Sequence, residues 1–115
     1  MRILLDECVN AGVSNALPGH AVKTVAQTGW CGTADGPLLV LAQEQFDVFV
    51  TIDRSLEYQQ NCKRFDLGFI IVHVRSNEIS SYLHLFAQIK EAAEKVRAGE
   101  MIHVVSPESR GESRS

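Results

Sequence analysis

Three aspartates are the residues of this sequence best placed to do chemistry. Asp6 follows the apolar run Ile3–Leu5, and Asp53 follows the run Val48–Ile52. Asp35 lies at the start of a segment with helical periodicity. In open parallel α/β sheets the ligand crevice lies beyond the carboxyl ends of the strands, so acids at these points are placed for chemistry. Carboxylates held close together repel unless a cation neutralises them, and hard cations such as Mg²⁺ or Mn²⁺ prefer oxygen ligands. The pattern therefore predicts a metal site.

Polar neighbours extend this candidate site. Glu7 is adjacent to Asp6 and is a further candidate ligand. Arg54 lies beside Asp53, and polar residues follow the third and fourth apolar runs, where they could supply neutral oxygens or bind a phosphate together with the guanidinium. The candidates for phosphate binding are Arg54, Gln60, Asn61, Ser76 and Asn77.

Several of these residues have a purely structural alternative. Asp35 could cap the helix, a role worth about 1 kcal/mol. The run Gln59–Asn61 could be the solvated end of a short helix. No histidine lies at ligand spacing, and His73, inside an apolar run, fits a core histidine with a satisfied hydrogen bond. Trp30 could stack on a base or pack partly on the core.

Short apolar runs alternate with helical segments along the chain. We expect strands at about 2–5, 20–25, 48–52, 68–74 and 101–105, and helical segments at about 8–17, 35–45, 55–61 and 79–98. Glycines predict a loop over 27–33, residues 33–35 can cap the second helix, and Gly99 is expected to end the last one.

This alternation predicts an α/β fold, a three-layer α/β/α sandwich with a mostly parallel five-stranded sheet. The strand order is not readable from the sequence. The flavodoxin-like order 2-1-3-4-5 would place the first strand beside the third, so that Asp6 and Asp53 converge, whereas other orders would separate them.

Length and composition favour one soluble domain. The 115 residues predict a single domain over 1–105, followed by a tail, 106–115, whose Ser-rich composition predicts disorder. A net charge of -3 argues against a broad cationic face for duplex DNA. We see neither a membrane-spanning apolar run nor a signal peptide, so we expect a cytoplasmic protein. The three cysteines show no CxxC spacing, which favours buried thiols over disulfides or structural zinc.

Three motifs together resemble the PIN-like domains of bacterial toxin-related proteins. They are Leu4-Leu5-Asp6-Glu7, Gly32-Thr33-Ala34-Asp35 and Val50-Thr51-Ile52-Asp53-Arg54. PIN domains are metal-dependent ribonucleases with a cluster of acids at the strand ends, and many are toxins held inactive by an antitoxin. The resemblance covers nearly the whole chain up to Val105. It implies an Mg²⁺- or Mn²⁺-dependent endoribonuclease with an RNA substrate and an antitoxin partner, and with Asp6, Asp35 and Asp53 as catalytic residues. Self-association into a homodimer is also left open.

The match has one gap, which leaves other functions open. PIN-like sequences of this kind often carry Asp-x-Asp-Phe after the third strand, whereas here Asp53-Arg54-Ser55-Leu56 lacks the second acid. A PIN-like fold that has lost activity would serve as a binding or regulatory module. A receiver domain would use Asp53 as its phosphate acceptor, but the lysine that such domains carry after the last strand is absent, because Ser106-Pro107 follows Val105.

Overall fold

The computed structural model describes residues 1–106, so the tail predicted to be disordered lies, apart from Ser106, outside the described residues. Five strands alternate with α-helices and 3-10 helices (η). The elements in chain order are β1 (Arg2–Leu5), η1 (Ala11–Ala16), β2 (Ala21–Thr24), α1 (Val25–Thr28), α2 (Asp35–Gln45), β3 (Val48–Thr51), α3 (Leu56–Gln59), η2 (Cys62–Arg64), β4 (Gly68–Val72), η3 (Ile79–Ser81), η4 (Leu83–Leu85), α4 (Phe86–Lys95) and β5 (Met101–Val104).

The five strands form one sheet in which every pair is parallel, as the alternation predicted. The strand order is β2-β1-β3-β4-β5, so β1 lies beside β3 and the edges of the sheet are β2 and β5. Leu5 is in register with Val50, and Thr51 is in register with Ile71. This is the order that brings the ends of the first and third strands together, which the sequence had left open.

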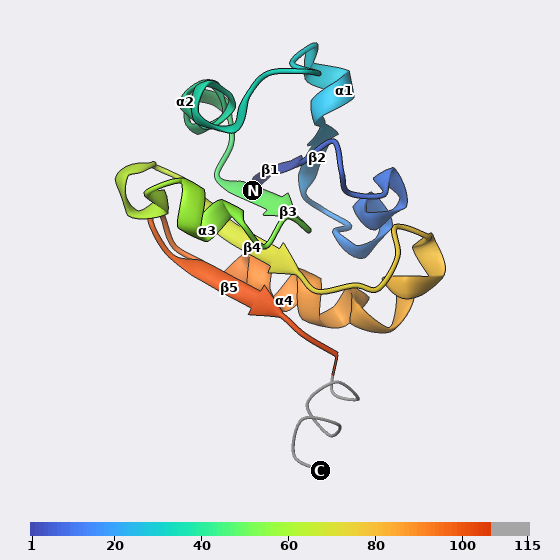
Figure 1. The fold of residues 1–115 in the computed structure, drawn as a ribbon. Coiled ribbons are helices and arrows are strands. Elements are labelled where there is room, and N and C mark those ends of the chain that lie inside the picture. Colours follow the sequence, from blue (N-terminus) through green and yellow to red (C-terminus); the bar gives the residue numbers. More distant parts are fainter. Residues whose placement is uncertain (107–115) are drawn as a thin grey trace.

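Helical segments cover both faces of the sheet (Figure 1). Leu4, Phe49 and Phe69 pack on the face covered by α2, together with Leu38 and Leu39 of that helix. The alternate strand residues pack on the opposite face with η1 and α4. Because β3 and β4 are buried on both faces, their sequences are continuous apolar runs rather than alternating ones.

The predicted helix over 79–98 is wrong in its extent. Its first part is two 3-10 turns, in which Tyr82 and Leu85 are buried and the Tyr82 hydroxyl donates to Asn77 Oδ1 at 2.6 Å. The α-helix ends at Lys95, because Val96 turns into extended backbone and packs in the core. Gly99 has a φ of 82° and lies in the turn before β5, not directly after the helix.

The predicted loop over 27–33 is also partly wrong, because its first residues belong to α1. Thr24 ends β2 and caps this helix: its Oγ1 accepts from Gln27 N at 3.2 Å, and its own N–H donates to Gln27 Oε1 at 2.9 Å. This reciprocal pair is a capping box, which a Thr-x-x-Gln pattern can encode in a very short helix. Within residues 1–106, no helix combines the length and the apolar character needed to cross a bilayer.

Candidate functional site

A buried threonine joins the two aspartates that follow β1 and β3. Asp6 is 9% exposed, and its backbone N–H donates to Val50 O at 2.9 Å, which extends the pairing of the two strands. Thr51 is fully buried; its Oγ1 donates to Asp6 Oδ2 at 2.8 Å and accepts from the Asp53 backbone N–H at 3.0 Å. One hydroxyl therefore fixes the Asp6 carboxylate relative to the backbone of Asp53.

The carboxylate of Asp53 is held by the residue that replaces the missing acid. Asp53 Oδ1 accepts from the Ser55 backbone N–H at 3.0 Å and from Ser55 Oγ at 2.6 Å. Serine at this position is a neutral donor, whereas an aspartate would add a second negative charge beside Asp53. The gap in the acidic pattern is therefore filled by a hydrogen bond that orients Asp53.

Asp35 is the first residue of α2, and the negative charges of three other acids act on it. Burial is the largest cause that raises the pKa of its carboxyl group, and the charges of Asp6, Asp53 and Glu7 raise it further. The expected capping role is wrong: the N-cap is Ala34, and no side chain caps this helix. The charges that follow β1 and β3 therefore disfavour the ionised form of Asp35 at the start of α2. We call Asp6, Glu7, Asp35 and Asp53 the acidic rim.

Two side chains next to Asp6 complete this part of the site. Glu7 is exposed, and its Oε1 accepts from the Gly32 backbone N–H at 3.3 Å, in the segment before α2. Cys8 Sγ lies 3.4 Å from Asp6 Oδ2, and burial raises the pKa of its thiol, so the thiol stays protonated at neutral pH. Cys8 therefore acts as a weak donor to Asp6.

The donor set of the acidic rim fits a hard divalent cation by its chemistry. All four groups are carboxylates; burial is the largest cause that raises the pKa of Asp35, and the negative charges of the other three raise it further. Among residues 1–106, however, no three His, Cys, Asp or Glu side chains lie close enough together to hold one ion. Mg²⁺ is commonly held by only one or two carboxylates together with several waters, so the rim is compatible with such an ion.

The five candidates for phosphate binding lie in three places. Arg54 is exposed, and its charge lowers the pKa of His73, which places it toward the end of β4. Gln60 lies near Gly36 in the first turn of α2, beside Asp35, and both Gln60 and Asn61 line a pocket next to β5.

The other two candidates, Ser76 and Asn77, are used inside the fold. Ser76 Oγ pairs with Ser81 Oγ at 2.8 Å, and the Asn77 carbonyl accepts from Asn10 Nδ2 at 2.8 Å. Together with the bond from Tyr82 to Asn77, these contacts fasten the connection after β4 to η3 and η1. These contacts give the two residues a supporting role within the fold, and none of the contacts involves a residue of the acidic rim.

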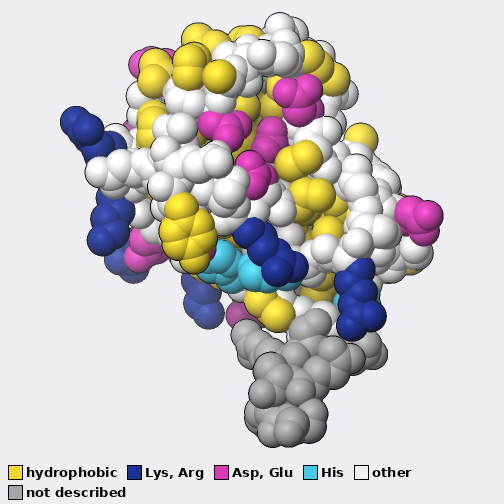
Figure 2. Space-filling view, in the orientation of Figure 1, with side chains coloured by type: hydrophobic (Ala, Val, Ile, Leu, Met, Phe, Trp, Pro, Cys, Tyr) yellow, Lys and Arg dark blue, Asp and Glu magenta, His cyan; other side chains and the backbone are white. Residues whose placement is uncertain are grey.

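Two histidines form a pair that the sequence did not reveal. His73 Nε2 lies 2.7 Å from His103 Nδ1, and His103 Nε2 lies 3.2 Å from Glu57 Oε1. Burial is the largest cause that lowers the pKa of His73, followed by the charges of Arg54 and His103. The pairing follows from the register of β4 and β5. His103 of β5 is opposite Ile71 of β4, and His73 follows Ile71 by two residues, so that its side chain is on the same face of the sheet. Figure 2 shows acidic side chains gathered on one face, with histidine and basic side chains beside them.

The raised pKa of Asp35 leads to a prediction about stability. The folded state binds the carboxyl proton of Asp35 more tightly than the unfolded state does, so ionisation of Asp35 destabilises the fold. This loss of stability is complete at pH values above the pKa of Asp35 in the folded state. Asp35→Asn should therefore raise the melting temperature at pH 7 by a few degrees, corresponding to less than about 1 kcal/mol for a partly exposed group. The gain should shrink towards zero as the pH falls to about 3, where the wild-type carboxyl is protonated. Thermal melts across this range check it, and a gain that grows on acidification would contradict it.

Comparison of the chain with protein-family models, with curated proteins and with solved structures finds no match.

Proposed function

We propose that this chain is a metal-dependent ribonuclease with a PIN-like three-layer fold, which hydrolyses RNA phosphodiesters at the acidic rim. The observation that carries the proposal is the Thr51 hydroxyl, which donates to Asp6 Oδ2 and accepts from the Asp53 backbone N–H and so joins the acids that follow β1 and β3. The charges of both acids also act on Asp35, at the start of α2. The parallel sheet supports the proposal, because open α/β sheets bind their ligands at the carboxyl ends of the strands.

Each residue of the rim has a role in this proposal. Asp6, Asp35 and Asp53 would hold Mg²⁺ or Mn²⁺, one or two of them directly and the others through the ion's waters, with Glu7 at the margin. When bound, such a cation supplies an activated water and neutralises charge on the phosphate. Thr51 fixes the orientation of Asp6, and Ser55 fixes that of Asp53. These bonds organise the carboxylates before substrate arrives, which lowers the cost of assembling the site.

Arg54 is the residue that we assign to the substrate phosphate. It is exposed, and within residues 1–106 its side chain makes no hydrogen bond or ion pair, so the guanidinium is available to an anion. A guanidinium can bind two phosphate oxygens at once. Gln60 lies near Gly36, next to Asp35 in the chain, and its amide could donate to the same RNA backbone.

A second function, that of a binding module without activity, is favoured by one observation. No three potential ligands among the described residues lie within reach of one ion, and Ser55 stands where the resemblance places an acid. In that case the rim would be a recognition surface. We propose a cognate antitoxin as the protein partner in either case, as the toxin-related resemblance implies.

An RNA cleavage assay separates the two functions. Purified wild type should cut single-stranded or structured RNA with Mn²⁺ or Mg²⁺ and should be inactive in EDTA. Asp35→Asn should lower cleavage by on the order of tenfold or more, since a lost ligand weakens the metal site. Asp35 makes no side-chain hydrogen bond in the described part of the chain, so this substitution breaks none. Lys23→Gln, on the far edge of the sheet, is the matched surface control. If wild type leaves a panel of RNAs uncut with either metal, the binding module is favoured.

A further inference from the structure

Among the described residues, no strand pairs with the outer side of the edge strand β5. The Phe69 N–H donates to Glu100 O and the His73 N–H donates to Val104 O, both at 2.9 Å. Residues along a strand direct their backbone groups alternately to its two sides, so Glu100, Ile102 and Val104 face β4. Met101 and His103 therefore direct their N–H and C=O groups away from the sheet.

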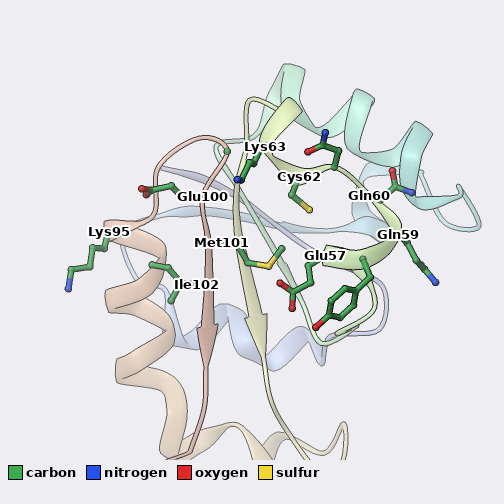
Figure 3. Close-up of a pocket in the computed structure, with 12 residues that line it drawn as sticks. Glu57, Gln59, Gln60, Cys62, Lys63, Lys95, Glu100, Met101 and Ile102 are labelled. Carbon is green, nitrogen blue, oxygen red and sulfur yellow. The ribbon is translucent and has the colours of Figure 1, made fainter.

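Residues 99–102, at the start of this edge, line a groove of about 920 Å³, and His103 lines a smaller hollow beside α4. Figure 3 shows β5 between two walls, with Glu57 and Gln59 from α3 on one side and Lys95 from α4 on the other. Met101 and Ile102 point toward opposite walls, in agreement with their packing against the two separate cores. The groove thus contains both elements that an added strand needs: backbone groups that face away from the sheet and room for side chains on both faces.

Two lysines and two glutamates line the groove, and the lysines are the less engaged of these charged groups. Both glutamates bond within the fold: Glu57 Oε1 lies 3.2 Å from His103 Nε2, and Glu100 Oε1 accepts from the Arg97 backbone N–H at 2.9 Å. In the described part of the chain Lys63 has no ion pair. Lys95 pairs only with Glu91, at 3.6 Å, with both side chains 72% exposed, and such a pair is weak. Two lysines therefore border a floor that includes Met101, Ile102 and the buried Cys62.

The other edge of the sheet differs from β5. Strand β2 carries an exposed lysine, Lys23, a device that discourages edge pairing. Strand β5 has the sequence Met-Ile-His-Val, without a Lys, Arg, Asp or Glu. The two edges are therefore unequal, and β5 is the one suited to accept a further strand.

We propose that the β5 groove binds an extended acidic and apolar peptide segment of a partner protein, which pairs with β5 as a sixth strand. Four residues of β5 extend over roughly 13 Å at about 3.3 Å per residue, so four or five peptide residues fit. Main-chain bonds to Met101 and His103 hold the peptide, its apolar side chains meet Met101 and Ile102, and its carboxylates meet Lys63 and Lys95. This binding does not depend on the acidic rim or on RNA cleavage.

A peptide selection with the full chain as bait tests the proposal. The probe is a phage-displayed library of random 12-residue peptides. We expect enrichment of sequences in which apolar residues alternate with Asp or Glu. The enriched peptides, synthesised and titrated by fluorescence polarisation, should bind Lys63→Glu and Lys95→Glu at least about fivefold more weakly than wild type, and N-methylation of alternate peptide amides should weaken binding by on the order of tenfold. Lys23→Glu, on the β2 edge, is the matched control and should bind as wild type does. Thermal melts establish that each variant is folded.

Three results would overturn the proposal. The first is a selection without enrichment of acidic and apolar peptides. The second is binding that neither Lys63→Glu nor peptide N-methylation weakens, since the groove would then not be the site. The third is a wild-type dimer in sedimentation equilibrium that Met101→Pro dissociates, because β5 would then pair with a second copy of this chain. Met101→Pro removes a backbone N–H that faces the open edge, a position at which proline is tolerated, and Met101→Ala is the control for loss of the Met101 side chain from the core.

Discussion

Replacing Thr51 with valine should destabilise the fold by about 2–3 kcal/mol and should lower metal-dependent cleavage by at least roughly tenfold. Valine has nearly the shape of threonine but lacks the hydroxyl that donates to Asp6 and accepts from the Asp53 backbone. Asp6 is almost fully buried, so its carboxylate would lose a hydrogen bond without gaining water. The stability loss and the activity loss thus have one cause.

Chemical denaturation and the cleavage assay measure these two effects of Thr51→Val. Thr51→Ser is the matched control, because it keeps the hydroxyl and loses only a methyl group; it should recover most of the activity. A Thr51→Val protein that is as stable and as active as wild type would mean that the Thr51 hydroxyl does not organise the rim.

Ser55→Asp should raise the affinity for Mn²⁺ by on the order of tenfold and increase cleavage, because it adds an acid beside Asp53 at the position where PIN-like sequences often carry one. The same change should destabilise the metal-free protein. Ser55 now donates twice to Asp53, and an aspartate would replace the bond from the hydroxyl with repulsion between two carboxylates. Metal binding relieves that repulsion, so the two effects have opposite signs.

Melting temperatures with and without Mn²⁺ measure both effects of Ser55→Asp, since a ligand that binds only the native state stabilises it by mass action. Ser55→Asn is the matched control, because it changes the shape in a similar way but adds no charge. Equal Mn²⁺ responses in Ser55→Asp, Ser55→Asn and wild type would show that this position does not contribute to a metal site.

The strands could be predicted from the sequence because their burial leaves a direct signal. The run Val48–Thr51 consists of apolar and β-branched residues, and the sheet buries both of its faces. The closeness of Asp6 and Asp53 followed as soon as β1 was known to lie beside β3. That order is a tertiary property, and short apolar runs of similar composition do not specify which of them are neighbours.

The contacts that organise the rim were not predictable in the same way. Thr51 is one β-branched residue within an apolar run, and its bond to Asp6 depends on the register of two strands. The pair of His73 and His103 likewise needs β4 and β5 side by side. The length of α4 was overestimated because Val96 leaves the helix to pack in the core, and helical periodicity alone does not reveal this.

Calorimetric titration of Mn²⁺ into wild type and Asp35→Asn tests the central claim, that the acidic rim holds a cation, most directly. The proposal predicts one ion per chain for wild type and on the order of tenfold weaker binding for Asp35→Asn, about 1.4 kcal/mol. The reason is that the variant loses the negative charge of Asp35, on which the charges of Asp6, Asp53 and Glu7 act. Lys23→Gln should bind as wild type does. No heat beyond dilution in wild type, or equal affinity in wild type and Asp35→Asn, would contradict the claim.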